Sequence, residues 1–303
     1  MNNKSLRGSL LLLLGAVIWG VAFVAQRMGM DSMPPLAFNG IRMLLAGIAL
    51  LPVIAFADRK EPARKPATAE QKKDLRIAGL LCGTLLFVSS SLQQVGLVYT
   101  SAGKAGFITA LYVVLVPVIS WTVFRRNPGR VIWLSVALAV AGLYLLCAPA
   151  GGEALNRGDL LVLGCAVCFT GHIMVVDHYA PRVDGIRLSC IQFFVCGILS
   201  MMLSVPTEAI TWEGIRGAMI PILYAGIMSG AVGYTLQIIG QRDVNPTVAS
   251  LLMCLESVFA VLTGAVVLGE RMTAGEGIGS VLMLCAVVLA QLSPILSRKL
   301  KKA

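Results

Sequence analysis

The side chain in this sequence best suited to bind a solute or a proton is a single acid inside an apolar run. Glu256 lies near the middle of the apolar stretch 247–268, about ten residues, or about 15 Å of helix, from either end. A carboxyl group at such a depth is costly unless it is paired, hydrated or protonated, so it is a candidate functional group. An equal alternative is that it locks helices together. A seven-residue spacing predicts that one helical face carries it with Arg242, Ala249, Thr263 and Glu270.

Three further ionisable side chains interrupt apolar segments and are candidates for coupling or gating. His172 could relay a proton, because an unperturbed imidazole changes charge near neutral pH, although a hydrogen-bonded packing role is the commoner one. Arg42 lies about seven residues inside its segment, where we expect an ion pair or a carbonyl partner rather than snorkelling. Lys104 lies close to a segment end, either snorkelling or at the mouth of a cavity.

Amide and aromatic side chains add contacts that suit a polar solute without a charge preference. Gln93 with Gln94, and Gln237 with Gln241, offer donors and acceptors, with interhelical hydrogen bonding as the alternative. Aromatic rings could form apolar walls, although most single rings in apolar helices serve packing. The residues that we expect to contact a solute are Trp19, Gln93, Tyr112, His172, Tyr234, Gln237 and Glu256.

No cofactor or metal site is expected. The eight cysteines lie in apolar segments, and the CxxC of Cys165 and Cys168 has neither a second pair nor a histidine at ligand spacing. The sequence contains no GxxxxGK[ST], no GxGxxG after a strand and no HExxH. Pumping driven by ATP is therefore not expected of this chain alone.

The elements that must position these residues are membrane-spanning helices. The chain is 57% hydrophobic and only 13% charged, against about 25% charged in ordinary soluble proteins, which rules out a water-soluble enzyme. Windows of about 20 residues, the length that spans a bilayer, identify ten apolar segments. We therefore predict an all-α membrane protein. The segments are 8–26, 36–57, 77–99, 103–124, 131–149, 159–177, 186–205, 218–240, 247–268 and 277–296.

The distribution of basic residues predicts the orientation of these helices. With the N-terminus inside, most of the 25 Lys and Arg residues fall in inner loops, so we expect both termini in the cytoplasm and no nucleic-acid partner. The polar stretch 58–76 reads as a cytoplasmic linker, and the residues after Arg298 form a basic cytoplasmic tail. The first segment resembles a signal peptide, but nine further spans favour an uncleaved helix.

An internal repeat divides the chain into halves, 1–150 and 151–303. A shift of 150 lays GSLLLLLGAVIWG from Gly8 over GDLLVLGCAVCFT from Gly158, and a shift of 144 lays residues 100–112 over 244–256. Since five is odd, two five-helix repeats must have opposite orientations in the bilayer. Inverted repeats are typical of secondary transporters. The alternatives are an ancient duplication in a membrane enzyme and an inert scaffold.

The sequence resembles the EamA-type, ten-helix members of the drug/metabolite transporter superfamily. The resemblance covers nearly the whole chain and rests on LLLLLGAVIWGVAFVAQ, YTSAGKAGFITALYVVLVPVIS and NPTVASLLMCLESVFAVLTGAVVLGERMT. It implies two inverted five-helix repeats around a central cavity, with the fifth and tenth helices peripheral. It also implies export or exchange of small metabolites, amino acids or drugs, without identifying the solute.

We therefore predict a secondary transporter of the inner membrane that moves a small solute by alternating access, with protons or another ion as a coupling partner. Its partners are the solute and the lipid bilayer, and a monomer and a homodimer both remain open. The competing class is a membrane-embedded enzyme acting on a lipid or isoprenoid, although no loop gathers the acids, histidines or nucleophile that it needs. A channel is the third alternative.

Overall fold

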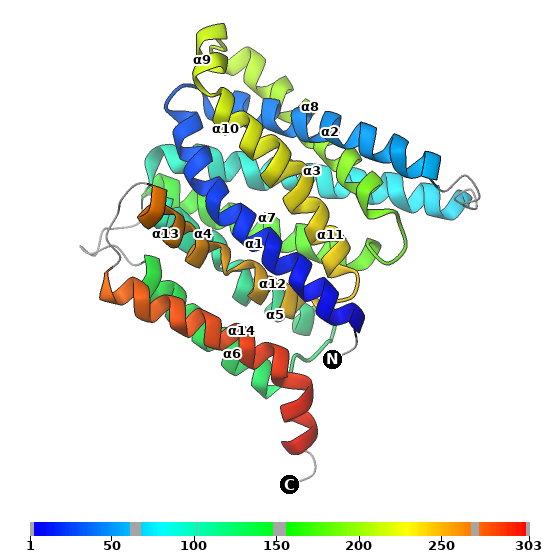
Figure 1. Cartoon of the computed structure of the whole chain (residues 1–303), viewed down its shortest axis with the longest axis vertical. Helices are drawn as coiled ribbons and strands as arrows, with labels where there is room; N and C mark the ends of the chain where they lie inside the picture. The colour runs from blue at the N-terminus through cyan, green and yellow to red at the C-terminus, as the bar shows by residue number, and fades with distance from the viewer. Residues whose placement is uncertain (1–2, 61–67, 101, 148–155, 268–272, 301–303) are drawn as a thin grey trace.

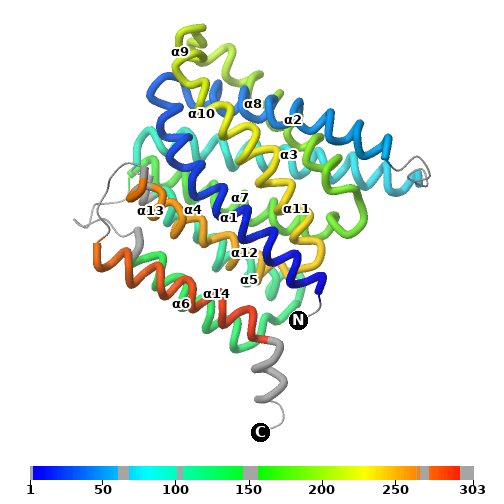
Figure 2. Tube along the Cα trace, in the orientation of Figure 1, coloured from blue at the N-terminus to red at the C-terminus, as the bar shows by residue number. Residues whose placement is uncertain are grey.

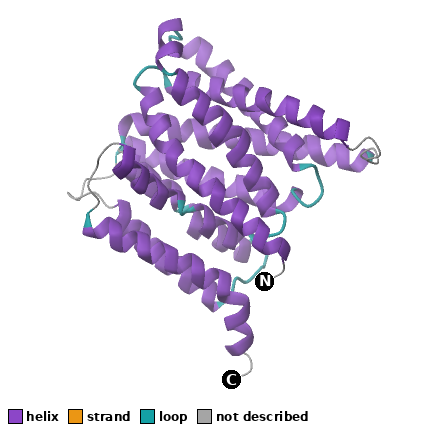
Figure 3. Ribbon diagram, viewed as in Figure 1, coloured by secondary structure: helices purple, strands orange, loops and turns teal. Residues whose placement is uncertain are grey.

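Each of the ten apolar segments contains helix in the computed structural model, which describes residues 3–60, 68–100, 102–147, 156–267 and 273–300 (Figure 1). Every element in these ranges is helical, and short loops join them (Figure 3). The helices are α1 (Asn3–Met30), α2 (Pro35–Lys60), α3 (Ala69–Tyr99), α4 (Ala102–Ala110), α5 (Tyr112–Thr122), α6 (Arg130–Cys147), α7 (Arg157–Tyr179), α8 (Gly185–Thr207), α9 (Trp212–Gly217), α10 (Met219–Leu223), η1 (Tyr224–Tyr234), α11 (Thr235–Gln241), α12 (Pro246–Met253), α13 (Glu256–Val267) and α14 (Ala274–Leu300).

The predicted membrane spans are confirmed. Among the described residues, nine helical stretches are long and apolar enough to cross a bilayer, and α6 supplies a shorter apolar helix over Arg130–Leu145. Large apolar side chains such as Met202, Ile220 and Val266 are exposed on the outside of the bundle. Such a surface suits lipid, because the helices satisfy their own backbone hydrogen bonds.

The polar linker predicted over 58–76 is too long. α2 continues to Lys60, and α3 begins at Ala69 behind an N-cap at Thr68. Thr68 accepts from the backbone N–H of Gln71, whose side chain accepts from the backbone N–H of Thr68, so a capping box starts the helix outside the apolar segment. Residues 61–67 lie outside the described part of the chain.

The fourth and ninth spans are broken helices, which corrects the expectation of a continuous face through Glu256. α4 ends at Ala110 and α12 at Met253. At the breaks, Leu111 and Leu255 donate to carbonyls only three residues back, at 3.2 and 3.3 Å, a tighter turn than in an α-helix. Arg242 lies before α12, and Glu270 lies outside the described residues.

The eighth span consists of α10, η1 and α11 in succession, and η1 is a π-helix. Its glycines allow close packing: a Cβ at Gly226 would lie 2.9 Å from the Arg42 carbonyl, and one at Gly230 would lie 2.8 Å from Ala46 Cβ. This pair of glycines four residues apart therefore lets the backbones of two helices approach closely.

The packing of the helices has the pattern expected for two halves related by a pseudo-twofold axis. α3 packs against α7, and correspondingly η1 and α11 pack against α1. α2 packs against its own counterpart α8, and α6 against its counterpart α14, so these pairs straddle the axis. α6 and α14 lie side by side at one edge of the bundle, as Figure 2 also shows. The ends of α1 and α14 that are nearest the chain termini point toward the same end of the bundle (Figure 1).

Candidate functional site

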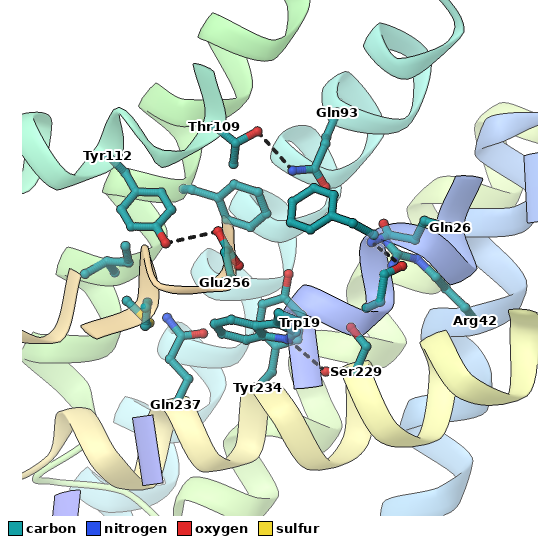
Figure 4. Close-up of a pocket in the computed structure, with 15 residues that line it drawn as sticks. Trp19, Gln26, Arg42, Gln93, Thr109, Tyr112, Ser229, Tyr234, Gln237 and Glu256 are labelled. Carbon is teal, nitrogen blue, oxygen red and sulfur yellow. Dashed lines mark hydrogen bonds between the residues drawn. The ribbon is translucent and has the colours of Figure 1, made fainter. Parts of the chain in front are cut away.

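One cavity lies where the broken helices meet α1, α2, α3, α7, η1 and α11 (Figure 4). It holds about 50 Å³ of space that the centre of a water molecule can reach, several times what one buried water needs. Its lining is aromatic and polar, and consists of Trp19, Ala22, Phe23, Gln26, Arg42, Gln93, Thr109, Tyr112, Phe169, Ile173, Ser229, Tyr234, Gln237, Met253 and Glu256.

Glu256 is buried at the cavity as the first residue of α13. Tyr112, the first residue of α5, donates its hydroxyl to Glu256 Oε1 at 3.1 Å. The break gives the carboxyl a place in the first turn of a helix, where the dipole favours negative charge. The acid is therefore bonded by a neutral donor, and it faces the cavity rather than an ion-pair partner (Figure 4).

Carboxamides extend the polar lining on both repeats. Gln93 Nε2 donates to Thr109 Oγ1 at 3.1 Å, and Gln237 Nε2 donates to Gln241 Oε1 at 2.9 Å. Two amide oxygens of the lining, Gln26 Oε1 and Gln237 Oε1, are buried and have no hydrogen-bond partner in the described part of the protein. Unsatisfied buried acceptors are uncommon, and a bound donor would remove the cost.

Two aromatic side chains form a wall of the cavity. The rings of Trp19 and Tyr234 lie 4.9 Å apart between centroids, tilted by 58°. Trp19 Nε1 donates to the Ser229 carbonyl at 3.2 Å, which joins α1 to η1. The indole face is therefore held against the cavity by a specific hydrogen bond.

Arg42 lies at the opposite side of the cavity from Glu256 (Figure 4). Its Nε and Nη2 donate to Asn39 Oδ1 at 3.1 and 2.9 Å. The Asn39 amide nitrogen donates in turn to Ser90 Oγ and Ser200 Oγ, so α3 and α8 orient the amide. Of the two partners expected for Arg42, an ion pair or a carbonyl, the described residues supply the carbonyl oxygen of the Asn39 side chain and no ion pair.

Seven of the sequence-derived candidates line the cavity: Trp19, Arg42, Gln93, Tyr112, Tyr234, Gln237 and Glu256. The structure does not bring His172 to it. His172 is fully buried behind Tyr234, with ring centroids 6.1 Å apart, and its Nε2 lies 2.9 Å from Gln192 Oε1. Lys104 is part of α4, but its side chain lies outside the described residues.

Sequence reasoning missed Gln26, Thr109 and Ser229 as lining residues. The repeat gave no signal for Thr109, because it matches this residue with the apolar Met253. Nothing local distinguishes Gln26 or Ser229 from other polar residues on apolar helices.

Fold and site together define a class of protein. A multi-pass membrane bundle of two inverted repeats, with a polar cavity at discontinuous helices, is the architecture of membrane transporters. The chain belongs to the EamA-like transporter family, whose model matches residues 6–148 and again residues 156–292.

Relatives of similar length support this assignment. An uncharacterized transporter of Archaeoglobus fulgidus is 33% identical, with 95% of this chain and 87% of that protein covered. The uncharacterized inner membrane transporter YedA of Escherichia coli strain K12 is 25% identical, with 92% of this chain and 89% of that protein covered. A solved crystal structure has the same fold, with a TM-score of 0.76 at 18% identity, covering 97% of this chain and 98% of that chain.

Proposed function

We propose that this protein is a secondary transporter that moves a small metabolite, amino acid or drug-like solute across the cytoplasmic membrane by alternating access. The observation that carries the proposal is the position of the cavity at the breaks of the fourth and ninth spans. Discontinuous helices at corresponding positions of inverted repeats are the best structural pointer to a transported solute.

The lining of the cavity supports this proposal through its repeat symmetry. Ten of its 15 residues form five repeat-related pairs, separated by 144 or 150 residues in the sequence. The pairs are Trp19 with Phe169, Phe23 with Ile173, Gln93 with Gln237, Thr109 with Met253, and Tyr112 with Glu256.

The other five lining residues break the symmetry. Ala22, Gln26, Arg42 and Ser229 lie in the halves of their spans away from the chain termini, and Tyr234 lies near the middle of its span. Their repeat counterparts are packed elsewhere in the bundle, and they are His172, Val176, Gln192, Leu85 and Ser90.

This asymmetry is what one state of an alternating-access carrier requires. If the two repeats exchange conformations, the packed counterparts become the lining, and the present extension of the cavity closes. The same pocket then opens toward the end of the bundle that holds the termini. With the basic loops cytoplasmic, the present cavity extends toward the outside.

The test is solute counterflow in proteoliposomes. A resistance screen of overexpressing cells with toxic metabolites and drugs supplies candidate solutes, and each is loaded on one side and traced from the other. A carrier accelerates exchange when solute is present on the far side, whereas a channel does not. Flux without such trans-stimulation for every solute that crosses would refute the alternating-access mechanism.

A further inference from the structure

The side of the cavity away from Glu256 contains a buried cation that has no counter-ion within the described ranges of the chain. Arg42 is only 3% exposed, and its guanidinium has five N–H donors. Two of the five bond to Asn39 Oδ1, and the remaining three have no partner among the described residues. A guanidinium at membrane depth is costly unless its charge and its donors are satisfied.

The surroundings hold Arg42 in place without neutralising it. Asn39 is fully buried, and both donors of its amide are engaged by serine hydroxyls, so its oxygen must face the arginine. The ring of Phe38 lies 5.8 Å from the guanidinium carbon. A network that fixes an arginine with neutral groups leaves the charge available to a ligand.

We propose that Arg42 is an anion subsite and that the transported solute carries a carboxylate that binds there. Arg suits this role because its planar fork pairs with a carboxylate through two parallel hydrogen bonds. The inference rests on the proposed function, since it assigns the solute chemistry of the same cavity.

Two neighbours of Arg42 in the cavity bear on the solute: Gln26 suits a hydrogen-bond donor beside the anion, and Glu256 disfavours a phosphate dianion. Gln26 Oε1 is an unpartnered acceptor on the same side of the cavity as Arg42 (Figure 4). The ammonium of an amino acid or the hydroxyl of a hydroxy acid, next to the carboxylate, would donate to it. The acid Glu256 lines the same cavity, and a second negative charge on the solute would be repelled by its ionised form.

The test uses Trp19 as a reporter, because its ring lines the cavity. In the purified full chain, Trp121, Trp133 and Trp212 are replaced by Phe, which leaves Trp19 as the single tryptophan. Mandelate, its neutral isostere mandelamide, and phenyl phosphate are titrated against Trp19 fluorescence. We expect saturable binding of mandelate and at least about tenfold weaker binding of the other two, because charge-assisted hydrogen bonds are lost or mismatched.

Two variants test whether Arg42 causes the preference for mandelate over mandelamide. Arg42→Gln removes the charge, and Asn39→Asp keeps the guanidinium but gives it an internal carboxylate partner. Both are expected to weaken mandelate binding about tenfold or more and to weaken mandelamide binding less, because only mandelate loses a charge-assisted hydrogen bond. The wild-type comparison of mandelate with mandelamide stands even if a variant fails to fold.

Any of four results would overturn the subsite: no response to mandelate, equal affinity for mandelamide, tighter binding of phenyl phosphate, or an unchanged preference in a folded Arg42→Gln variant. Counterflow separates this outcome from failure of the proposed function. Trans-stimulated exchange of an uncharged solute without a carboxylate preference would retain the carrier and remove the subsite. Arg42-dependent mandelate binding in a protein without trans-stimulation would retain the subsite and refute the carrier.

Discussion

Tyr112 and Glu256 occupy equivalent positions in the two repeats, 144 residues apart, and they are hydrogen-bonded to each other at 3.1 Å. Each is the first residue after the break in its span. A contact between equivalent positions must lie near the pseudo-twofold axis, so the breaks meet in the centre of the cavity. One repeat supplies a phenol there and the other an acid, which leaves a single carboxyl at the axis.

This arrangement predicts that Glu256 couples transport to protons. In proteoliposomes containing an accepted solute, we expect an imposed pH gradient to drive net flux by the wild type. Glu256→Gln keeps the shape and the acceptor for Tyr112 but cannot bind and release a proton, so gradient-driven flux should fall at least about tenfold while counterflow persists.

Tyr112→Phe is the matched control for that experiment. It removes one neutral hydrogen bond, worth about 1 kcal/mol, without removing the titratable group. Gradient-driven flux should therefore remain sensitive to pH. Equal gradient-driven flux by wild type and Glu256→Gln would exclude this residue from coupling.

Repeat exchange predicts opposite accessibility at Gln26 and Val176, which are related by a shift of 150. In a background without native cysteines, Gln26→Cys should react with an impermeant thiol reagent from outside, and Val176→Cys from the cytoplasmic face. Ala166→Cys, at a buried position away from the cavity, is the control. Reaction at Val176→Cys no faster than at Ala166→Cys would contradict the exchange.

The Arg126–Asp177 ion pair is expected to hold the cytoplasmic side closed. The side chains are 2.8 Å apart and join the segment after α5 to the end of α7, with 54% and 15% of their surfaces exposed. Exposed pairs contribute about 0–1 kcal/mol, so Asp177→Asn should increase labelling of Val176→Cys by up to about fivefold. Exchanging the charges, with Arg126→Asp and Asp177→Arg together, should restore the slower rate.

Glu208 is expected to stabilise the start of α2. Its carboxylate accepts from the backbone N–H of Leu36 and Ala37, at 3.0 and 2.7 Å, and from Ser204 Oγ at 2.7 Å. Glu208→Gln should lower stability by about 1–2 kcal/mol, as for loss of a helix cap. The melting temperature in detergent measures the change.

The repeat supplies a control for this prediction, because Asp58 is the counterpart of Glu208 at the other end of the α2–α8 pair. Asp58 pairs with Arg187 at 2.5 Å, and both side chains are substantially exposed. Asp58→Asn should therefore cost less than Glu208→Gln. The reverse order of melting temperatures would refute the capping role.

The ten spans could be predicted from sequence because insertion into a bilayer depends on the summed hydrophobicity of about 20 local residues. The repeat was equally readable, since it lies in the residue pattern itself. The breaks after Ala110 and Met253 could not be predicted from sequence, because residues 111–112 and 254–256 carry no Gly or Pro that would mark an interruption.

The residues of the site were likewise only partly predictable from the sequence. Glu256 and Arg42 were found because a charged residue inside an apolar segment is conspicuous in any sequence. His172 has the same local appearance, yet it is packed behind Tyr234. Gln26 looks no different in the sequence from the buried Gln94, which does not line this cavity. Hydrophobicity and duplication are properties of the chain, so the sequence alone determined the spans, their number and their pairing. Whether a polar side chain faces the cavity or a neighbouring helix depends on how the helices rotate and pack against one another, and only the tertiary structure decided that.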